Sequence, residues 1–282
     1  MRGLVGQSPV TSSQLPVKIP GVNRIVLLLL LLLPVRAFAQ GPIVAVGGGD
    51  TGPEIVGRVL ELAGGRQAIV AVLPQSSAEP DAGDASVKMW LEAGAKAAAK
   101  VTFGDRAAAR ASLERATLIW MPGGDQNRFM AAIAGTGLDE VIRARHRAGA
   151  AVGGTSAGAA VLAAEMFTGD ADLKSLTAGA TVTARGLGLL PGLLIDQHFL
   201  KRQRDNRLIS AVLDHPPLVG VGIDESTAIV VRGDRFDVIG ASSVVVVDAR
   251  RARVNKAAPG ELVSGTGVAL AVLKAGQSYT IR

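Results

Sequence analysis

Cysteine is absent from the 282 residues of the chain, which excludes a disulfide scaffold, a thiol nucleophile and any thiolate metal site. Histidine is scarce: the three are His146, His198 and His215, which is few for a metal enzyme. The longest uninterrupted apolar run, Ile25–Leu33, has nine residues, well short of the ~20 that a membrane-spanning helix needs. The Gly47–Asp50 turn lacks the G-x-G-x-x-G spacing of a dinucleotide site. We therefore expect neither a metal nor an organic cofactor.

The charges of the chain are unevenly distributed. The formal charge is +6 at pH 7, which on its own indicates an anionic partner such as nucleic acid. Residues 1–39 carry four bases and no acid, so the rest of the chain holds 26 bases against 24 acids. The composition, 48% hydrophobic and 19% charged, is typical of a folded domain. We expect a nearly neutral folded body and no nucleic-acid partner.

Residues 1–39 are typical of an export signal. A basic leader precedes the apolar run, and Ala37 and Ala39 then form the A-x-A pattern that a signal peptidase requires. We expect cleavage after Ala39, no stable membrane anchor afterwards, and a periplasmic or extracellular protein. The absence of cysteine suits such an oxidising compartment. The alternative is a membrane anchor, which the short apolar run disfavours.

From Pro42 onward, short β-branched runs alternate with helical stretches, which is typical of a mostly parallel sheet with covering helices. The predicted strands are Ile43–Val46, Ile69–Leu73, Val101–Phe103, Leu118–Met121 and Ala151–Gly153. The predicted helices are Glu54–Ala63, Ser86–Ala95, Arg106–Ala116 and Leu138–Ala148. The strand residues are apolar without alternation, so we expect strands that are buried on both faces.

The C-terminal part is predicted to be rich in strands. Residues 165–184 have no clear period and indicate a loop. The strands expected beyond it are Leu218–Ile223, Ala228–Val231, Phe236–Ile239, Val244–Val247 and Val268–Val272. They either complete the sheet or form a small second layer. Because no linker divides the chain, residues 40–282 are predicted to form a single α/β domain.

Ser156 is the predicted nucleophile. It lies in Gly154-x-Ser156-x-Gly158, where an apolar strand passes through small residues into a helix-forming stretch. A nucleophile at such a turn needs glycine on both sides, because its strained backbone leaves no room for neighbouring side chains. The alternative is a glycine-rich turn that only packs the helix against the strand.

A serine hydroxyl needs a base, normally an imidazole, to become reactive. His146 lies in a basic helical stretch and is predicted to be a solvated surface residue. His215 precedes two prolines and is predicted to end a helix or to lie in a turn. His198 follows Leu193–Gln197, an apolar run that ends in two polar residues, as a strand end at a cleft would. We predict that His198 is the base.

An acid is then expected to hold the second nitrogen of the imidazole. Glu225 suits this role because it follows one apolar strand and precedes another. Its rivals are Asp196, Asp224 and the loop acids Asp170 and Asp172. Composition alone does not choose among them.

Four segments in order resemble the signature blocks of the cyanophycinases, serine peptidases related to the aspartyl dipeptidases: MPGGDQNRF, GGTSAGAAVL, DQHFLKRQRDNRL and GIDESTAIVV. The resemblance extends from about Ile43 to beyond Val231. It implies a Ser-His-Glu triad in which the acid follows the histidine by 27 residues, and Glu225 has this spacing from His198. The resemblance therefore favours Glu225 as the acid.

The resemblance also implies a flavodoxin-like sheet, akin to that of the class I glutamine amidotransferases. The chain order Ser156, His198, Glu225 differs from the order of the α/β-hydrolases, which disfavours a lipase or esterase of that fold. Aspartyl dipeptidases are known for an Asp between the serine and the histidine. Asp170 and Asp172 lie in that interval here and remain the runner-up acids.

Attack by Ser156 leaves negative charge on the carbonyl oxygen, which N–H donors have to stabilise. We predict the N–H of Ala157, at the start of the following helix, as one donor. Gly124 is predicted as the other, since it follows the strand Leu118–Met121 and glycine permits close approach. For Gly124 the alternative is a simple strand-to-helix turn.

Arginines follow the predicted base, and guanidinium groups bind carboxylates bidentately. A run of this kind is otherwise a solvated basic face. The substrate contacts that the resemblance implies are Gln126, Asp196, Gln197, Arg202, Arg204 and Arg207.

The substrate that the resemblance implies is cyanophycin, a polymer with an aspartate backbone and an arginine joined to each side-chain carboxyl. Each unit carries a carboxylate, which the arginines would bind, and a guanidinium, which acids such as Asp196 would bind. The expected product is the β-Asp-Arg dipeptide. The alternatives are a peptidase of short aspartyl peptides and a non-catalytic protein of the same fold that binds acidic peptides. The sequence leaves the oligomeric state open, a homodimer included.

Overall fold

The computed structural model describes residues 40–169 and 175–281. The predicted export signal, residues 1–39, and the runner-up acids Asp170 and Asp172 lie outside these ranges. Export, cleavage after Ala39 and the division into a signal and one domain therefore stay predictions. Within the described ranges, no helix combines the length and the apolar character that crossing a bilayer requires.

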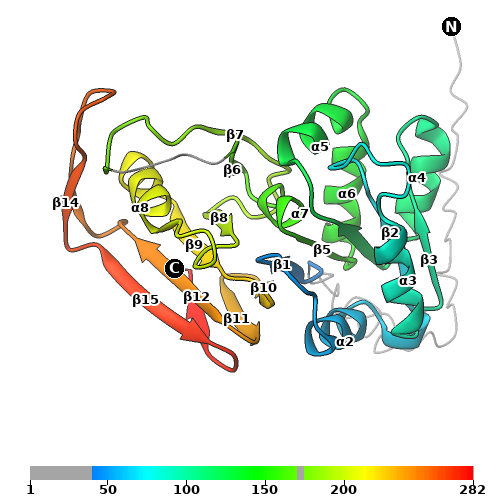
Figure 1. Cartoon of the computed structure of the whole chain (residues 1–282). Coiled ribbons are helices and arrows are strands. Elements are labelled where there is room, and N and C mark those ends of the chain that lie inside the picture. The colour runs from blue at the N-terminus through cyan, green and yellow to red at the C-terminus, as the bar shows by residue number, and fades with distance from the viewer. Residues whose placement is uncertain (1–39, 170–174, 282) are drawn as a thin grey trace, which may run out of the picture. The chain divides into compact units, whose positions relative to one another are not determined.

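The largest sheet of the described residues has eight strands (Figure 1). They are β1 (Ile43–Val46), β2 (Ile69–Val72), β3 (Ala97–Lys100), β4 (Leu118–Met121), β5 (Ala151–Thr155), β10 (Thr227–Arg232), β11 (Arg235–Gly240) and β16 (Ser278–Thr280). Their order is β16-β11-β10-β1-β5-β4-β2-β3. The five from β1 to β3 in this order run parallel, and the other three extend the sheet by antiparallel pairing.

Helices cover both faces of this sheet. They are α2 (Pro53–Leu62), α3 (Asp84–Glu92), α4 (Arg106–Arg115), α5 (Gln126–Ile133), α6 (Leu138–Arg147) and the short α7 (Ala157–Ala160). In β1, Ile43 and Ala45 join one apolar core with α4, α5 and α6, while Val44 and Val46 join another with α2 and α3. The strand is therefore apolar at every position because both of its faces are buried, as predicted.

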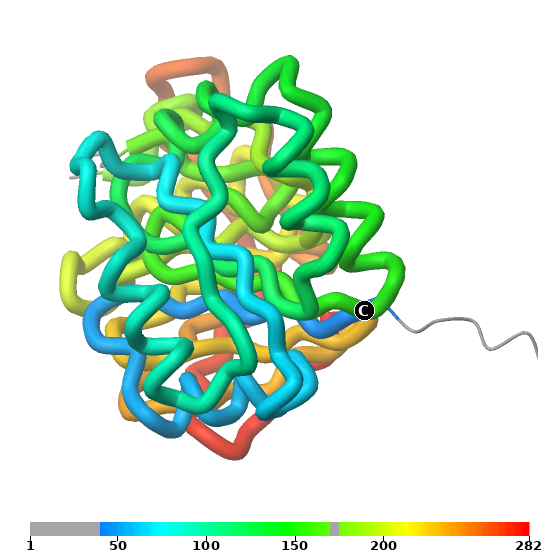
Figure 2. The backbone as a smooth tube through the Cα atoms, turned by 90° about the vertical axis from the view of Figure 1, so that its right-hand side faces the viewer, coloured from blue at the N-terminus to red at the C-terminus, as the bar shows by residue number. Residues whose placement is uncertain are grey.

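A second sheet has the order β15-β12-β9-β8. Its strands are β8 (Leu193–Gln197), β9 (Val219–Ile223), β12 (Ser243–Asp248) and β15 (Ala269–Lys274), and α8 (Asp205–Asp214) packs on it through Leu208 and Val212. Two-stranded sheets pair β6 (Glu165–Phe167) with β7 (Thr183–Arg185), and β13 (Arg253–Asn255) with β14 (Ser264–Thr266). In Figure 2 the orange-to-red C-terminal strands lie behind α3 and α4, towards the far end of the main sheet. The C-terminal strands thus both complete the main sheet and form a second one.

The predicted fold class is confirmed: a mostly parallel sheet flanked by helices is followed by a part rich in strands. Most predicted elements lie within three residues of the observed bounds. The strand predicted at Val101–Phe103 is wrong, because β3 occupies Ala97–Lys100, where parallel pairing with β2 overrides the weak β-propensity of alanine. Residues 165–184 are not only loop, since β6 lies at one end and β7 begins at the other.

One carboxylate joins the two large sheets. Asp248, at the end of β12, accepts hydrogen bonds from the guanidinium of Arg250 at 2.7 and 3.0 Å and from the hydroxyl of Tyr279 in β16 at 3.0 Å. The hydrogen bond from Arg250 is the largest influence on the pKa of Asp248, which falls from 3.8 to about 2 although burial acts to raise it. The contact therefore stabilises the fold while Asp248 is ionised.

We expect Asp248 to make the fold sensitive to acid. Because its pKa is lower in the folded than in the unfolded chain, its stabilisation is present above about pH 4 and is lost as the pH falls to about 2. Asp248→Asn should lower the free energy of unfolding at pH 7 by about 1 kcal/mol and reduce the acid dependence. Chemical unfolding at pH 7 and pH 3 checks this, with the exposed Asp81→Asn as control. An unchanged acid dependence in Asp248→Asn would contradict it.

Candidate active site

Ser156 lies in the sharp turn between β5 and α7. Its backbone has a φ of 53° and a ψ of −117°, a conformation that residues with a side chain rarely adopt. The flanking glycines are required, because a Cβ at Gly154 would lie 2.4 Å from the carbonyl oxygen of Gly158. A Cβ at Gly158 would lie only 1.9 Å from the carbonyl oxygen of Met121. This strand–turn–helix arrangement presents the Ser156 hydroxyl at the carboxyl end of β5.

His198 directly follows β8 and faces Ser156. Its φ is 49°, and its backbone N–H donates to the carbonyl oxygen of Gly47 at 2.6 Å. The side chain is 11% exposed. Its Nε2 lies 2.8 Å from Ser156 Oγ, which is hydrogen-bond distance.

Glu225 lies in the turn between β9 and β10, and its Oε1 is 2.7 Å from His198 Nδ1. Because a carboxylate only accepts, Nδ1 carries the proton, and Nε2 of the neutral ring is the acceptor that faces the Ser156 hydroxyl. The three side chains are separated by 42 and 27 residues along the chain. The structure brings together the residues that the sequence predicts as nucleophile, base and acid.

The Gly47–Gly49 turn after β1 packs against both the imidazole and the carboxylate. A Cβ at Gly48 would lie 2.2 Å from His198 Cε1, and a Cβ at Gly49 would lie 2.8 Å from Glu225 Cβ. Both glycines have positive φ, 105° and 66°, which side chains disfavour. The turn therefore sets where the side chains of His198 and Glu225 can lie.

Asp224, one of the rival acids, holds the turn after His198. It accepts hydrogen bonds from the backbone N–H groups of Leu200 and Lys201 at 3.1 and 3.0 Å and from the hydroxyl of Ser242 at 2.7 Å. Burial is the largest single influence on the pKa of Asp224 and acts to raise it, but these hydrogen bonds together lower it. Asp224 is thus an ionised structural group, and the carboxylate on His198 belongs to Glu225.

The other two histidines lie elsewhere. His215 ends α8, as predicted. The surface position predicted for His146 is wrong: its ring is buried, and Nε2 hydrogen-bonds to the carbonyl oxygen of Gly41 at 2.7 Å. Burial lowers the pKa of His146, although the hydrogen bond to Gly41 acts to raise it. The ring ties α6 to the segment before β1.

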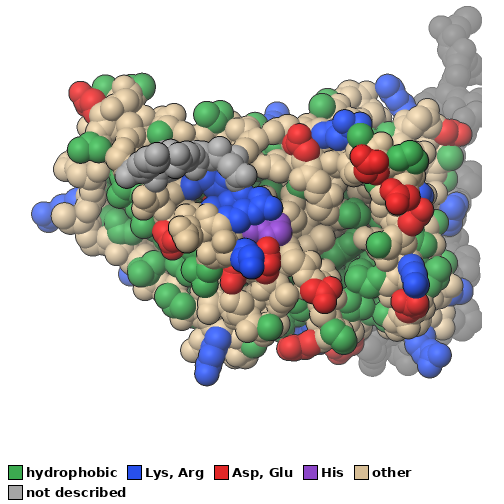
Figure 3. Space-filling model, viewed as in Figure 1, with side chains coloured by type: hydrophobic (Ala, Val, Ile, Leu, Met, Phe, Trp, Pro, Cys, Tyr) green, Lys and Arg blue, Asp and Glu red, His purple; other side chains and the backbone are tan. Residues whose placement is uncertain are grey.

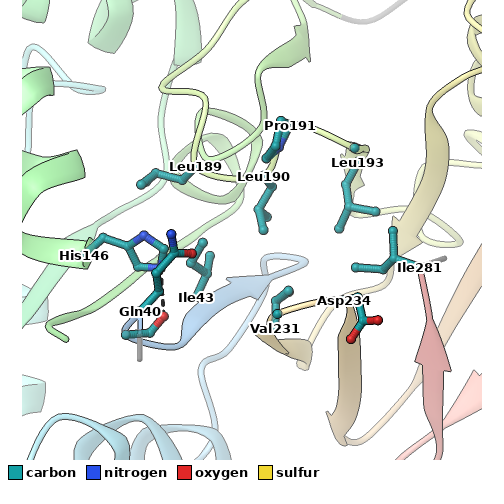
Figure 4. A pocket seen from close by; sticks show the side chains of 13 residues that line it. Gln40, Ile43, His146, Leu189, Leu190, Pro191, Leu193, Val231, Asp234 and Ile281 are labelled. Atoms are coloured by element: carbon teal, nitrogen blue, oxygen red, sulfur yellow. Dashed lines mark hydrogen bonds between the residues drawn. The ribbon is translucent and has the colours of Figure 1, made fainter. Parts of the chain in front are cut away.

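His146 also lines a pocket of about 300 Å³ with mostly apolar walls (Figure 4). Ile43, at the start of β1, lies in the same wall. The strands β1 and β5 run parallel, Ile43 begins β1, and Ser156 follows the end of β5. Ser156 and this pocket therefore lie at opposite ends of the strands. Ligands of parallel sheets bind at the carboxyl ends of the strands, where Ser156 lies and this pocket does not.

A second pocket, of about 240 Å³, opens beside Ser156. Its other lining residues are Gly124, Asp125, Gln126, Asn127, Thr168, Gly169, Gln197, Arg202 and Arg204. Basic side chains gather next to a histidine on this face, with acidic ones nearby (Figure 3). The pocket is polar and carries charges of both signs.

Four of the six predicted substrate contacts line this pocket: Gln126, Gln197, Arg202 and Arg204. The amide nitrogen of Gln126 donates to the carbonyl oxygen of Phe167 at 2.9 Å. The guanidinium of Arg204 donates to the backbone and side-chain oxygens of Gln197 at 2.6 and 2.9 Å. Hydrogen bonds within the protein therefore orient the polar wall of the pocket.

Asp196 and Arg207 lie beneath the pocket and not in its wall. Asp196 is fully buried and accepts two hydrogen bonds from Arg207, and Arg204 Nη1 lies 3.5 Å away. The guanidinium of Arg207 also stacks over the ring of Phe167, 4.6 Å from its centre. Asp196 has no exposed surface in this structure, so its predicted contact with a substrate stays a prediction that the structure does not show. The pair instead supports Arg204 and Gln197 from below.

The predicted oxyanion donors both lie next to Ser156 or its pocket. Ala157 is the first residue of α7, and N–H groups in the first turn of a helix have no acceptor within it. Gly124 lines the pocket with a φ of 137°. Ser76, which the sequence did not single out, touches this turn: a Cβ at Gly124 would lie 2.3 Å from the carbonyl oxygen of Ser76. Its position just after β2, at the carboxyl edge of the sheet, was the available signal.

Residues 43–239 match the family model described as Peptidase family S51. The chain belongs to this family. This S51 peptidase is 38% identical over 224 residues to the cyanophycinase of Geminocystis herdmanii, which covers 76% of this chain and 82% of that protein. It is 37% identical over 257 residues to the cyanophycinase of Synechococcus elongatus, which covers 86% and 80%. The predicted family is confirmed, and the chain is a serine-type peptidase.

Two solved structures share the fold of this S51 peptidase. A peptidase from an acI-B1 Actinobacterium has a TM-score of 0.65 at 20% identity, covering 88% of this chain and 100% of that chain. A putative peptidase E protein from Listeria monocytogenes EGD-e has a TM-score of 0.54 at 18% identity, covering 72% and 100%. At these identities the likeness concerns the fold alone.

We expect Gly48→Ala to remove most of the activity, because the new methyl group would collide with His198 and turn the ring away from Ser156. Loss of the imidazole base costs about 10³-fold or more in turnover. The measurement is the rate at which a serine-directed reagent labels Ser156, together with the Tm.

Gly64→Ala is the matched control for this variant. Gly64 has a φ of 102°, close to that of Gly48, but no atom lies within 4 Å of an added Cβ. Both variants therefore place alanine at nearly the same φ, and only Gly48→Ala meets the imidazole. Equal labelling rates in the two variants would show that the contact with the ring does not matter.

Proposed function

We propose that the chain hydrolyses cyanophycin, cutting its aspartate backbone to release β-Asp-Arg dipeptides through Ser156, His198 and Glu225. The observation that carries the proposal is the pair of hydrogen bonds that join the three side chains, 2.8 and 2.7 Å long, in a chain of Peptidase family S51. Support for the substrate comes from relatives named cyanophycinase that are 36–38% identical. Export, with cleavage after Ala39, belongs to the same proposal and rests on the sequence.

In the proposed reaction, Ser156 Oγ bonds to the scissile carbonyl carbon while its proton passes to His198 Nε2. The carbonyl electron pair moves onto the oxygen. When it returns, the C–N bond breaks and Nε2 gives the proton to the leaving amine. Glu225 stabilises the charged imidazole during these steps through Nδ1. Water then repeats the sequence on the acyl-enzyme and releases the acid product.

The backbone N–H groups of Ala157 and Gly124 are the proposed donors to the developing oxyanion. Such donors act mainly in the transition state, because the charge that they bind develops only there. Loss of one donor typically costs about 10² to 10³ in rate. These donors belong to the main chain, so their position has to be fixed by the surrounding structure.

The charges of the pocket fit a substrate that carries both a carboxylate and a guanidinium. Arg202 and Arg204 supply the positive side, and guanidinium groups bind carboxylates bidentately. On the negative side, the acid in the described lining is Asp125, since Asp196 is buried beneath Arg207. We therefore propose that Asp125 binds the substrate guanidinium in place of Asp196.

The proposed function predicts that the protein releases β-Asp-Arg from insoluble cyanophycin, identified by mass in the soluble fraction. Ser156→Ala and His198→Ala should lower the release by about 10³-fold or more, and Glu225→Gln by about 10⁴-fold, because each removes the relay that activates the hydroxyl. His215→Ala, at the end of α8, is the control that should retain activity.

Three other outcomes would replace this proposal. Cleavage of Asp-X dipeptides without release from the polymer would indicate a peptidase of short aspartyl peptides. Binding of acidic peptides without labelling of Ser156 by a serine reagent would indicate a non-catalytic protein. A large loss of activity in Asp172→Asn together with a small loss in Glu225→Gln would indicate that the catalytic acid lies in the segment between Ser156 and His198.

We expect Asp125→Asn to raise KM for the arginine-bearing substrate about tenfold, the effect of roughly 1.4 kcal/mol of lost attraction. Asparagine also caps helices, so the hydrogen bonds from the N–H groups of Asn127 and Arg128 to the side chain are retained. The matched control is Asp105→Asn, since Asp105 caps α4 in the same way outside the pocket.

A second substrate separates charge from shape in this test. In it citrulline, a neutral group of the same outline, replaces arginine. Wild type and Asp125→Asn should have similar KM values for the citrulline substrate. If Asp125→Asn raises KM equally for both substrates, or for neither, Asp125 does not bind the guanidinium.

A further inference from the structure

Ser76 forms hydrogen bonds with both ends of the turn between β4 and α5. Its hydroxyl lies 2.6 Å from the carbonyl oxygen of Gly123 and 3.0 Å from that of Pro122, so it donates chiefly to Gly123. Its own carbonyl oxygen accepts from the N–H of Asp125 at 2.8 Å. Ser76 is only 3% exposed, which removes water as a competing partner.

The peptide bond between Gly123 and Gly124 lies between two serines. A Cβ at Gly123 would lie 3.3 Å from Ser156 Cβ, and a Cβ at Gly124 would lie 2.3 Å from the carbonyl oxygen of Ser76. In a trans peptide the C=O and the following N–H point in opposite directions. Because the Gly123 carbonyl points to the Ser76 hydroxyl, the Gly124 N–H points away from Ser76.

Two successive glycines leave this peptide free to rotate, since neither residue restricts φ as a side chain would. Rotation by half a turn would exchange the N–H for the Gly123 carbonyl, whose partial negative charge repels an oxyanion. A donor that has to be in place before the reaction therefore needs a lock on this peptide. Ser76 is such a lock, because its hydroxyl donates to the Gly123 carbonyl at 2.6 Å and its own carbonyl accepts the N–H of Asp125, so the turn is held in the observed orientation on both sides of this peptide.

We propose that Ser76 is a positioning residue that keeps the Gly124 N–H directed at the oxyanion formed by Ser156. The inference rests on the proposed catalytic role of Ser156 and Gly124 but not on the identity of the substrate. Ser76 touches neither substrate nor reacting atoms and acts through one peptide bond. Since the oxyanion exists only in the transition state, loss of the lock lowers kcat and leaves KM unchanged.

The test compares Ser76→Ala with Ser210→Ala. Ser210 in α8 is also fully buried and donates one hydrogen bond to a backbone carbonyl, that of Thr177 at 3.1 Å, outside the pocket. Ser76→Ala should lower kcat about 10- to 100-fold with KM within twofold, and Ser210→Ala should leave both unchanged. Thermal unfolding should show similar losses of Tm in the two variants.

Two further variants separate the hydrogen bond from the volume of the side chain. Ser76→Cys fills nearly the same space with a much weaker donor, so its kcat should fall as in Ser76→Ala even if the alanine variant folds poorly. Ser76→Thr keeps the hydroxyl and should recover most of the lost kcat. A Ser76→Cys variant with wild-type kcat would overturn the proposal, as would a rise in KM without a fall in kcat.

A fluorophosphonate reagent makes the test independent of the substrate. Attack of Ser156 Oγ on its phosphorus atom also places negative charge on an oxygen that the oxyanion donors bind, before fluoride leaves. The maximal inactivation rate should therefore fall in Ser76→Ala by the same factor as kcat, with the reagent's half-saturation concentration unchanged. If the wild type reacts with the reagent but does not degrade cyanophycin, the proposed substrate fails while the role of Ser76 is still decided. Equal inactivation rates in wild type and Ser76→Ala would refute that role.

Discussion

Three consecutive backbone carbonyl oxygens at the end of β1 bind the three segments that carry Ser156, His198 and Glu225. Those of Val46–Gly48 accept, in this order, the backbone N–H groups of Ser156, His198 and Ser226, at 3.0, 2.6 and 2.9 Å. Each of these donors is one of the predicted catalytic residues or, for Ser226, the direct neighbour of Glu225. One short stretch of main chain therefore sets the spacing of three segments that are far apart in the sequence. Main chain is stiffer than any side chain, so the segments that carry Ser156, His198 and Glu225 are ordered before a substrate binds.

The site forms where the carboxyl edges of two sheets meet. Ser156 follows β5 and Gly124 follows β4 in the main sheet, whereas His198 follows β8 in the second sheet. Glu225 lies where the chain passes from β9 in the second sheet to β10 in the main sheet. The distance between Ser156 and His198 thus depends on how the two sheets are joined. The hydrogen bond from Ser242, on the next crossing between the sheets, to Asp224 reinforces this junction.

Local patterns allowed the sequence to predict the nucleophile, base and acid segments, because each places small or polar residues directly after an apolar strand. Long-range contacts explain what it missed. Successive residues of β8 face opposite sides, so Gln197 lines the pocket while Asp196 points into the interior, and only the packing of α8 decides which side is which. For His146 the signal was present, since it follows the buried Ile142 by four residues on one helix face. The basic neighbours concealed that spacing.

Backbone strain is concentrated at the same place. Among the described residues, the non-glycine residues with positive φ are Ser156, His198, Gln203 and Ser226. Each such conformation costs on the order of 1–3 kcal/mol and persists only where the surroundings enforce it. The carbonyls of Val46–Gly48 enforce it for three of the four, because each accepts the N–H of one strained residue. Relaxing one of them would break its hydrogen bond and leave a buried carbonyl unsatisfied, which costs about as much as the strain itself. The strained geometry is therefore the stable one as long as the carbonyls of Val46–Gly48 keep these three hydrogen bonds.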